Sequence, residues 1–363
     1  MKILHIIDHT GIGGAQTLLK EIFEHEKNNK NIFCYVLRNN KIKLEMNCPN
    51  LYLCKSYRKF DIRSLFKLKK IIKDQDIDVL HCHLLKSIFW GYLLKLLFFR
   101  DIKLVFHEHG EIYRTPKWYN FSLKKTQNKT NLFIAVSKAT KNKLVKNAGI
   151  NPDKIKVLYN FVDLNKFNSK RTGNFSQIKA RKKIGLNEDN FVIGFAGRLD
   201  KMKGCDILIK SIPYIKIKNL KILIAGSGTE RKKLEKLSKK LNVKNKTIFL
   251  DYIENIINFY GTIDVLVIPS RFEPFGLVVI EAQATGVPVV ASAVSGLNEI
   301  ISDGVTGLLF EPENEKDLAE KIELVCNNKK LREKLIENGL ENVRRYSLDN
   351  YLIELKKAYN KLF

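Results

Sequence analysis

The sequence predicts an α/β protein made of two domains, each a doubly wound parallel sheet with helices on both faces. Three observations support this prediction. The chain has 363 residues, 45% of them hydrophobic, which is enough for two separate cores. Short apolar segments typical of buried strands alternate with helical segments in two successive series, which begin at Ile3 and at Phe191. Glycine-rich turns follow several of these strand segments.

The first series predicts a parallel sheet that starts at the N-terminus. Its strands are expected at 3–8, 32–37, 50–53, 77–81, 103–107, 132–136 and 155–158. Glycines follow the first strand, and Gly13 and Gly14 would let the backbone come close to a ligand above the strand end. A tight turn without a ligand is the common alternative. Ser137 is expected to cap the helix after the sixth strand.

The second series predicts a second sheet of the same kind. A strand at 191–196 leads into a turn at 197–204, and a strand from Ile222 leads into a glycine turn at Gly226. A buried strand at 264–268 is followed by a turn and by a helix at 276–285. These turns are expected at one edge of the sheet, where such folds bind ligands.

Two carboxylates mark the turn and helix after the strand at 264–268. Glu273 lies in the turn, and Glu281 lies in an apolar helical segment, where an ionised side chain is costly unless it has a hydrogen-bonding partner. The helix start offers backbone amides near Phe275, Gly276 and Leu277, which suit a phosphate. Anion donors beside hydroxyl acceptors are what a nucleotide sugar requires. The alternative is that both glutamates are ordinary turn and surface residues.

Two cations follow the first strand of the second series. Arg198 and Lys203 flank a turn that ends at Gly204. A guanidinium and an ammonium already in place would stabilise charge that builds on a departing diphosphate. Solvated surface side chains are the alternative.

Histidines lie at the ends of two strands of the first series, in the segments 81–83 and 107–109. Four imidazoles could indicate a metal site, but two H-x-H pairs without a carboxylate framework are poor support for one, and we expect no metal. We favour His109, which precedes Gly110 at a strand end, over His107 as the residue that faces a bound sugar.

The segment from Ser270 to Ser292 contains the complete pattern S-x-x-E-x-F-G-x-x-x-x-E-A-x-A-x-G-x-P-V-V-A-S. It closely resembles the E-x7-E region of retaining glycosyltransferases of family 4, the glycosyl transferases group 1 family. The turn at 197–204 is similar to the family pattern G-R-L-x-x-x-K-G. The segment 159–167 resembles its N-G-V-D-x-x-x-F pattern, except that Phe161 replaces the glycine. The resemblance spans nearly the whole chain.

This resemblance implies the GT-B fold, in which two Rossmann-like domains face each other across a cleft. The implied acceptor-binding domain is 1–167, with a helix at 348–363 crossing back to it, and the donor-binding domain is 168–347. The implied donor contacts are Glu281 to the ribose, Arg198 and Lys203 to the diphosphate, Glu273 to the transferred sugar, and Gly226 in a nucleotide-side loop. Gly13, Gly14 and His109 would lie near the acceptor. Neither a cofactor nor a metal is implied.

Net charge is the strongest compositional feature. It is +26, and residues 1–166 hold 31 Lys and Arg against 14 Asp and Glu. Basic and aromatic residues at 57–73 and 116–125 could contact an anionic membrane surface, although the apolar face of 57–73 could instead pack on the sheet, and a lysine-rich composition is a further explanation. No nucleic-acid motif is found. The cysteines form no C-x-x-C pair and are expected to be reduced, and the segment 84–99 is too short to span a bilayer.

Together these features predict a retaining glycosyltransferase that is cytoplasmic and peripheral on the inner face of the membrane. It would transfer a hexose-type sugar from a UDP-sugar, with a GDP-sugar as the alternative, to a hydroxyl of a glycan or lipid-linked acceptor in polysaccharide, lipopolysaccharide or glycolipid assembly. Two other functions stay open on the sequence alone. One is a non-catalytic carbohydrate or membrane-surface binding protein, and the other is a sugar-nucleotide epimerase of the same fold.

Overall fold

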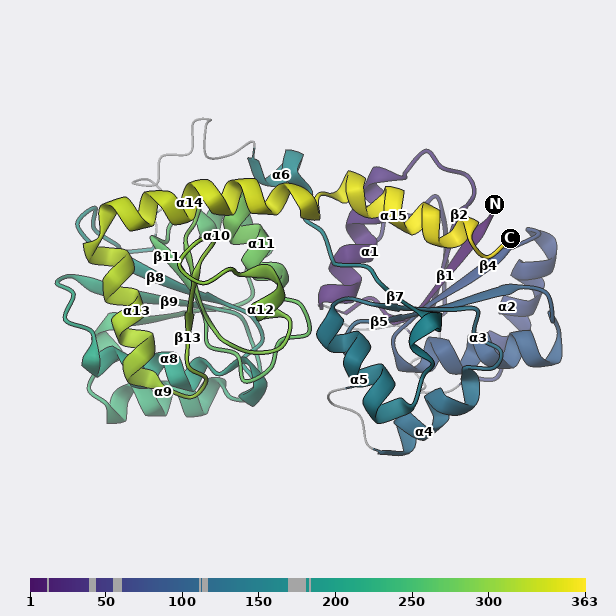
Figure 1. The fold of residues 1–363 in the computed structure, drawn as a ribbon, viewed down its shortest axis with the longest axis horizontal. Coiled ribbons are helices and arrows are strands. Elements are labelled where there is room, and N and C mark those ends of the chain that lie inside the picture. Colours follow the sequence, from purple (N-terminus) through teal and green to yellow (C-terminus); the bar gives the residue numbers. More distant parts are fainter. Residues whose placement is uncertain are drawn as a thin grey trace. The chain divides into compact units, whose positions relative to one another are not determined.

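The computed structural model consists of two compact units (Figure 1). It describes residues 1–11, 13–38, 44–54, 61–110, 112, 117–168, 181–182 and 184–363. The first unit is Met1–Asn160 together with Tyr351–Phe363, and the second is Phe161–Asn350. The sequence analysis placed the divisions at 167/168 and 347/348.

The first unit contains a parallel sheet of seven strands in the order β3-β2-β1-β4-β5-β6-β7. The strands are β1 (Ile3–His9), β2 (Ile32–Arg38), β3 (Asn50–Leu53), β4 (Val79–His83), β5 (Lys103–Glu108), β6 (Leu132–Ala135) and β7 (Ile155–Val157). The order changes direction at β1, which lies between β2 and β4. Such a switch point opens a crevice at the carboxyl ends of the two central strands, where ligands bind in folds of this type.

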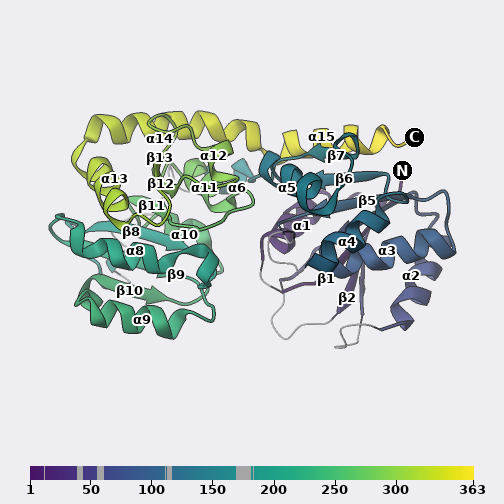
Figure 2. The same cartoon turned by 60° about the horizontal axis from the view of Figure 1, so that its bottom comes forward.

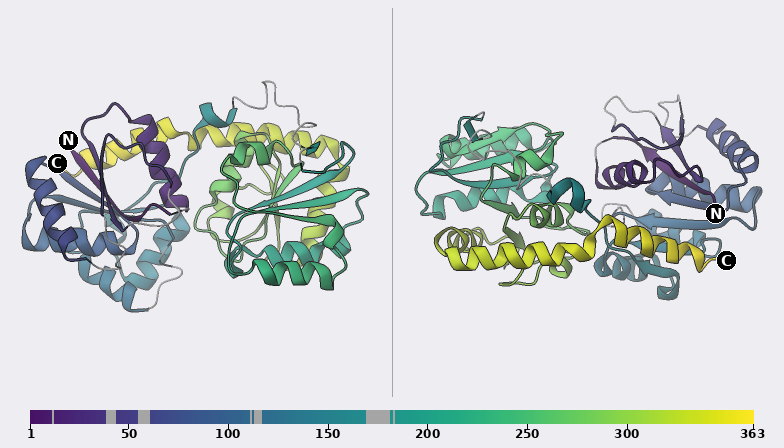
Figure 3. Two further views of the ribbon diagram at one scale, coloured as in Figure 1. Left: turned by 180° about the vertical axis from the view of Figure 1, so that it is seen from behind. Right: turned by 90° about the horizontal axis from the view of Figure 1, so that it is seen from above.

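Helices cover both faces of this sheet (Figure 1). They are α1 (Gly14–His25), α2 (Arg63–Asp74), α3 (Leu85–Leu97), α4 (Lys117–Thr126), α5 (Lys138–Ala148) and the C-terminal α15 (Leu348–Asn360). Side chains of α2, α3, α4 and α5 join one apolar core with alternate residues of the central strands, such as Leu80 and Phe106. The other face meets α1 and α15. Both chain termini lie in this unit and close to each other (Figure 3).

Two polar caps fix helix starts in the first unit. Asp8, at the end of β1, accepts hydrogen bonds from the backbone amides of Lys86 and Ser87 at the start of α3. Ser137 accepts one from the amide of Thr140 and caps α5, as predicted. The amides at a helix start have no partner within the helix, so both caps stabilise the chain where it leaves the sheet.

The second unit contains a parallel sheet of six strands in the order β10-β9-β8-β11-β12-β13. The strands are β8 (Phe191–Ala196), β9 (Leu220–Ala225), β10 (Thr247–Leu250), β11 (Val265–Ile268), β12 (Val289–Ser292) and β13 (Leu308–Phe310). The switch point lies between β8 and β11. The two parallel sheets with alternating helices confirm the predicted doubly wound fold class.

The helices of the second unit also form two layers around their sheet (Figure 2). They are α6 (Leu164–Asn168), α8 (Cys205–Ser211), α9 (Arg231–Lys240), α10 (Ile256–Tyr260), α11 (Leu277–Ala284), α12 (Leu297–Ile300), α13 (Glu315–Asn327) and α14 (Lys329–Val343). Side chains of α8, α9 and α13 share one apolar core with the sheet. On the other face, α10 packs so closely on Gly194 of β8 that a Cβ there would lie 2.9 Å from Phe259 Cζ.

The predicted strand at 77–81 was wrong in its position. β4 runs from Val79 to His83, because the backbone amides of Asp78 and Val79 bind the carbonyl of Lys2 and set the register beside β1. His83 therefore lies within the strand and not after it, and His81 lies in its middle. The predicted helix after the strand at 264–268 is one residue shorter at each end, as α11.

The chain passes between the units twice, and the two passages lie side by side. Val162 forms a parallel bridge with Ser347, its amide donates to the carbonyl of Tyr346 over 2.9 Å, and the amide of Leu348 donates back to Val162 over 3.2 Å. Phe161, which replaces the expected glycine, is buried. Residues 169–177, whose polar sequence with Gly173 predicts a linker between the domains, lie outside the described residues.

The apolar face of α2 packs in the core through Leu65, Leu68 and Ile72. This is the alternative considered for the basic segment 57–73, in which its apolar face packs on the sheet. The outer face of α2 is basic, and Phe66 is 59% exposed there. In α4, Phe121 is likewise exposed, with the Lys125 ammonium 4.7 Å from its ring. Residues 57–60 and 116 of the two basic segments lie outside the described part. Within that part, no helix has the length and apolar character needed to cross a membrane.

All six cysteines are free thiols. Four of them are buried: Cys34, Cys54, Cys82 and Cys205. Burial raises the pKa of the Cys34, Cys82 and Cys205 thiols, so these groups stay protonated and unreactive. Their surroundings match the mostly buried, unpaired cysteines that the sequence predicts.

A column of histidines lies on the sheet face toward α1 and α15. His5 of β1 is in register with His81 of β4, and His83 is in register with His107 of β5. His109 follows, with its ring 4.0 Å from that of His107. Burial lowers the pKa of His5 and of His109 from 6.5 to about 3, and burial together with the neighbouring rings holds the pKa of His81, His83 and His107 well below 6.5. The folded protein therefore holds all five rings uncharged at neutral pH.

This column predicts acid destabilisation. In the unfolded chain these histidines take up protons near pH 6.5, whereas in the folded chain His5 and His109 stay neutral down to about pH 3 and the pKa of each of the other three also lies well below 6.5. The unfolded state binds more protons in between, so the free energy of unfolding should fall as the pH drops below 6.5. Urea denaturation between about pH 7.5 and about pH 5 measures this slope.

A single substitution tests the source of that slope. His107→Leu removes one buried ring whose two nitrogens have no partner, and should reduce proton uptake on unfolding by about one. His25→Asn, at the exposed end of α1, is the matched control and should leave the slope unchanged. Equal slopes for His107→Leu and the wild type would contradict the assignment.

Candidate functional site

The candidate site lies at the switch point of the second sheet, in the loops that follow β8, β9 and β11. These loops interlock. The amide of Gly197 donates to the carbonyl of Ala225, and that of Leu199 donates to Ser227, so the loops after β8 and β9 continue as a ladder. Gly204 has φ 64°, and a Cβ there would lie 1.8 Å from the Pro269 carbonyl oxygen. Any larger residue would push the β8 and β11 loops apart.

Lys203 and Glu273 meet between two of these loops. Lys203 ends the short η3 helix (Lys201–Lys203) after β8, and Glu273 lies in the turn after β11. The Lys203 Nζ lies 2.6 Å from Glu273 Oε2, which also accepts a hydrogen bond from Ser270 Oγ over 3.2 Å. Glu273 is only 6% exposed, so its carboxylate depends on these partners.

Arg198 lies in the same loop as Lys203 and is exposed. Its Nε lies 3.3 Å from Asp200 Oδ2, while Asp200 Oδ1 accepts the backbone amide of Lys203. Asp200 thus orders the loop and links the two cations that the sequence analysis selected. Sequence reasoning missed Asp200, although an aspartate three residues before Lys203 is a typical N-cap signal.

Glu281 lies one turn inside α11 and is half-buried. Its carboxylate accepts a 2.7 Å hydrogen bond from the Tyr260 hydroxyl at the end of α10. Burial and the Glu281 carboxylate raise the pKa of Tyr260, so this hydroxyl keeps its proton and donates it. The Tyr260 hydroxyl is thus the hydrogen-bonding partner that the half-buried Glu281 carboxylate requires. The sequence did not indicate Tyr260.

The start of α11 lies beside Glu273. Gly276 has φ 110° in its N-cap position, a conformation that favours glycine, and a Cβ there would lie 2.8 Å from Leu297 Cδ2. The Phe275 side chain is buried, with its ring edge-on to Tyr346, so only its backbone is available to a ligand. The backbone amides from Phe275 to Leu277 stand at the positive end of the helix dipole.

Arg271 holds the turn after β11 in place and was not selected from the sequence. Its guanidinium donates to both carboxylate oxygens of Asp206 in α8, over 2.7 and 2.8 Å, and its Nη1 donates to the Lys201 carbonyl. Burial would raise the pKa of Asp206, but the hydrogen bonds and charge of Arg271 outweigh it and lower this pKa. Only the fold brings these residues together, because they are 65 positions apart.

The fold itself requires a glycine at position 226. Its φ is 137°, and a Cβ there would lie 1.9 Å from the Gly197 carbonyl oxygen. This glycine is required where the loops after β8 and β9 touch, whether or not a ligand binds above it.

The remaining candidates lie in the first unit, in loops after β1 and β5. Gly13 has an extended backbone and precedes α1, and its carbonyl accepts from the amide and hydroxyl of Thr17. Gly14, the first residue of α1, is exposed. These positions follow β1 at the switch point of the first sheet, where a ligand of this fold class would bind.

His109 directly follows β5 and is half-buried. Its Nε2 lies 3.0 Å from His83 Nδ1, and its own Nδ1 has no hydrogen-bond partner. The loop around it is held by Glu108, whose carboxylate accepts the amides of Gly110 and Ile112. His107 is buried within the strand, so of the two histidines His109 is the one placed in a loop.

The structure therefore gathers the candidates into two groups. Lys203 contacts Glu273, Arg198 is tied to the same loop by Asp200, and the start of α11 follows Glu273. Gly13, Gly14 and His109 lie at the carboxyl edge of the first sheet, in the other unit.

Two family models match this chain. One, described as Glycosyl transferases group 1, matches residues 176–342, and the other, described as Glycosyltransferase Family 4, matches residues 45–166.

Individual proteins are similar over most of the chain. An uncharacterized glycosyltransferase of Methanocaldococcus jannaschii is 35% identical over 78% of this chain and 75% of its own length. The capsular polysaccharide biosynthesis glycosyltransferase CapM of Staphylococcus aureus is 30% identical over 83% of this chain and 81% of its own. Among solved structures, Anabaena HepE in complex with UDP-glucose is 22% identical, with a TM-score of 0.88 over 99% of this chain and 100% of that one.

The likeness to HepE shows the fold and confirms the predicted pair of Rossmann-like domains of the GT-B type. The family models and the relatives of 30% identity or more show the family. Together with the E-x7-E turn and its contacts at the switch point, they establish that this chain belongs to the glycosyl transferases group 1 family and is a glycosyltransferase.

Proposed function

We propose that this glycosyltransferase moves a hexose-type sugar from a UDP-sugar to a hydroxyl of a glycan or lipid-linked acceptor, with retention of the anomeric configuration. A GDP-sugar is the alternative donor. The reaction would serve the assembly of a cell-surface polysaccharide, lipopolysaccharide or glycolipid.

The contact of Lys203 with Glu273 carries this proposal. In a nucleotide sugar, the sugar and the diphosphate share one oxygen, so the groups that hold them must be neighbours. Lys203 suits the diphosphate and Glu273 suits a sugar hydroxyl, and their side chains lie 2.6 Å apart.

The order of groups along α11 supports the same donor. Glu273 precedes the helix, the amides from Phe275 to Leu277 stand at its start, and Glu281 follows one turn later, about 6 Å along the axis. A nucleotide sugar presents its sugar, diphosphate and ribose in this order. Bound phosphate would take up the Lys203 ammonium, which would leave the Glu273 carboxylate for the sugar.

The chemistry of these groups is electrostatic. As the bond between sugar and phosphate breaks, negative charge builds on the diphosphate, and Arg198, Lys203 and the helix amides stabilise it without rearrangement. These groups can do the work that a divalent metal does in other transferases. Retention and independence from a metal rest on the family resemblance.

The donor and the acceptor are supported by relatives. HepE binds UDP-glucose, which favours UDP over GDP for this chain. CapM is a capsular polysaccharide biosynthesis enzyme, which favours a glycan under assembly as the acceptor. Gly13, Gly14 and His109, at the switch point of the first sheet, are the proposed acceptor contacts.

A peripheral place on the inner face of the cytoplasmic membrane suits a lipid-linked acceptor. The outer face of α2 carries Lys67, Lys70 and Lys73 around the exposed Phe66, and α4 adds Phe121 with Lys125. An aromatic ring framed by ammonium groups is a combination that binds anionic lipid.

Lys203→Ala should lower the rate of sugar transfer by about 10²- to 10³-fold, because it removes a preorganised charge from the developing diphosphate anion. Lys201→Ala, two residues away and exposed, is the matched control and should keep near wild-type activity. UDP release from UDP-sugars, measured with and without acceptor, reports the rate. Wild-type turnover in Lys203→Ala, with the fold intact by circular dichroism, would refute the role of this lysine.

Glu281→Ala should weaken UDP binding by about 10- to 100-fold, since a charged hydrogen bond to the ribose contributes about 1.5–3 kcal/mol. Glu281→Gln retains an acceptor for the Tyr260 hydroxyl, and therefore separates loss of binding from loss of packing. Calorimetry with UDP and GDP gives both the affinity and the base preference. Unchanged UDP affinity in both variants would remove Glu281 from the site.

The membrane proposal is tested by charge reversal. Replacing Lys67, Lys70 and Lys73 by Glu should lower binding to vesicles with anionic lipid by about 100-fold or more, at about 1 kcal/mol per lysine. The same reversal of Lys232, Lys236 and Lys239, which are exposed on α9 of the second unit, controls for net charge. Equal losses in both triple variants would show a general charge effect and contradict a specific face.

A further inference from the structure

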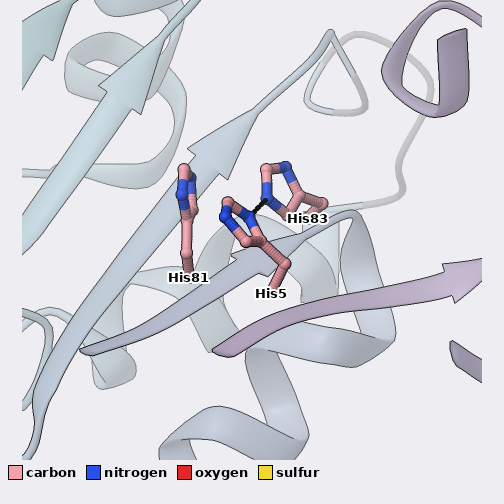
Figure 4. A group of neighbouring side chains, drawn as sticks. All are labelled: His5, His81 and His83. Carbon is pink, nitrogen blue, oxygen red and sulfur yellow. Dashed lines mark hydrogen bonds between the residues drawn. The ribbon is translucent and has the colours of Figure 1, made fainter. Parts of the chain in front are cut away.

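Three of the five column histidines bring their rings together where β1 and β4 pair. His5 is in register with His81, and His83 follows two residues along β4, so all three side chains leave the same face of the sheet (Figure 4). Their exposed fractions are 2%, 0% and 1%. The ring centroids are 4.1 Å apart for His81 and His83, and 5.0 and 5.3 Å apart for the pairs with His5.

The nitrogens of these rings converge. His5 Nδ1 lies 3.0 Å from His83 Nε2, and each of the three residues offers one nitrogen within 4.8 Å of the others. His81 Nε2 is buried and has no hydrogen-bond partner. Burying a polar nitrogen without a partner is unfavourable, and this atom is therefore free to bind a ligand that the ring cluster could hold.

We propose that His5, His81 and His83 form a binding site for one divalent transition-metal ion of the zinc and cobalt type. Three imidazoles suit these metals, whereas calcium and magnesium require oxygen ligands. At a metal–nitrogen distance of about 2.0–2.1 Å, tetrahedral ligands lie about 3.3 Å apart. The pair of His5 and His83 is already near this spacing, and the His81 nitrogen, within 4.8 Å of the other two, would move closer by at most about 1.5 Å. A water molecule would take the fourth position.

The surroundings of His81 resemble those of a metal ligand. Its Nδ1 lies 2.6 Å from the hydroxyl of Tyr359 in α15, which orients the ring and leaves Nε2 for the metal. Bound histidines almost always carry such a contact on the second nitrogen. His83 has one as well, since its Nδ1 lies 3.0 Å from His109 Nε2.

A cavity adjoins this site. It has a volume of about 430 Å³ and is lined by His5 and Tyr359, together with residues of α1 and α15. Of the three proposed ligands only His5 lines the cavity, so an ion would approach the cluster from the side of His5. The other close group of rings is His83 with His107 and His109. None of these three lines the cavity, and the nitrogens of His107 have no hydrogen bond that would orient its ring.

Metal binding would also fix the proton on His109. With the metal on His83 Nε2, the His83 proton must lie on Nδ1 and be donated to His109 Nε2. Neutral His109 then carries its own proton on Nδ1. The proposal rests on the rings of His5, His81 and His83 and not on the donor-binding residues of the second unit, so it can fail or hold independently of the proposed function.

The test is metal binding by tag-free, full-length protein after treatment with a chelator. Titration with cobalt chloride should give the visible absorption of a tetrahedral nitrogen site with one ion per chain, and zinc chloride should displace the cobalt. Zinc should also raise the melting temperature of the wild type. No saturable binding at one ion per chain would overturn the proposal, as would an absorption typical of thiolate ligands.

Four variants locate the ion. His5→Gln and His81→Gln should abolish binding at one ion per chain, and Tyr359→Phe, which keeps the ring packing, should weaken it by about 10- to 100-fold. His107→Gln belongs only to the neighbouring group and should bind as the wild type does. Binding that survives in folded His5→Gln, or that is lost in His107→Gln, would overturn this assignment. If the two glutamine variants fail to fold, unchanged affinity in Tyr359→Phe decides against it.

Discussion

The ion pair of Lys203 and Glu273 determines how the second unit presents its binding edge. Its partners come from loops that are 70 positions apart, and the carboxylate is almost fully buried. Removing one partner from such a pair leaves an uncompensated charge in a poorly polar environment. The loops after β8 and β11 must therefore stay together, and Asp200 and Arg271 hold the two ends of that arrangement. The pair is stable without substrate, yet a diphosphate can replace one partner and a sugar hydroxyl can engage the other.

Sequence reasoning succeeded where the signal is local. Buried parallel strands are continuous apolar runs, so β1, β2, β3 and β8 could be placed to within about a residue. It failed where the pairing of two strands decides at which residue a strand begins. The start of β4 depends on bonds from Asp78 and Val79 to Lys2, which no local pattern contains. The same limit applies to the site. The sequence singled out Glu273 and Lys203 for the chemistry of their side chains, but it could not show that the two residues contact each other.

Apart from Asp200, which lies three residues before Lys203, the partners that the sequence did not indicate are distant in the chain. Tyr260 binds Glu281 from 21 positions away, and His5 joins a histidine cluster whose other members stand about 76 positions further along the chain. A lone histidine in a strand is an ordinary core residue by any sequence measure. The expectation of no metal considered only the two H-x-H pairs. His5 joins His81 and His83 because β1 pairs with β4 in this register, which the sequence does not show. Gly226 is a different case. The sequence analysis selected it as a ligand contact, but the contact between the loops after β8 and β9 is enough to require a glycine there.

The division of the C-terminal helix between the units has a consequence for synthesis. Tyr351–Phe363 belongs to the first unit, but these residues are synthesised after the whole of the second unit. N-terminal domains usually fold first during translation. Here the part of the sheet face around His81 that α15 covers must wait until the entire second unit has been made and Tyr359 arrives. A chaperone has that interval in which to recognise the open part of the face, and a chain that stalls before Tyr351 leaves it exposed.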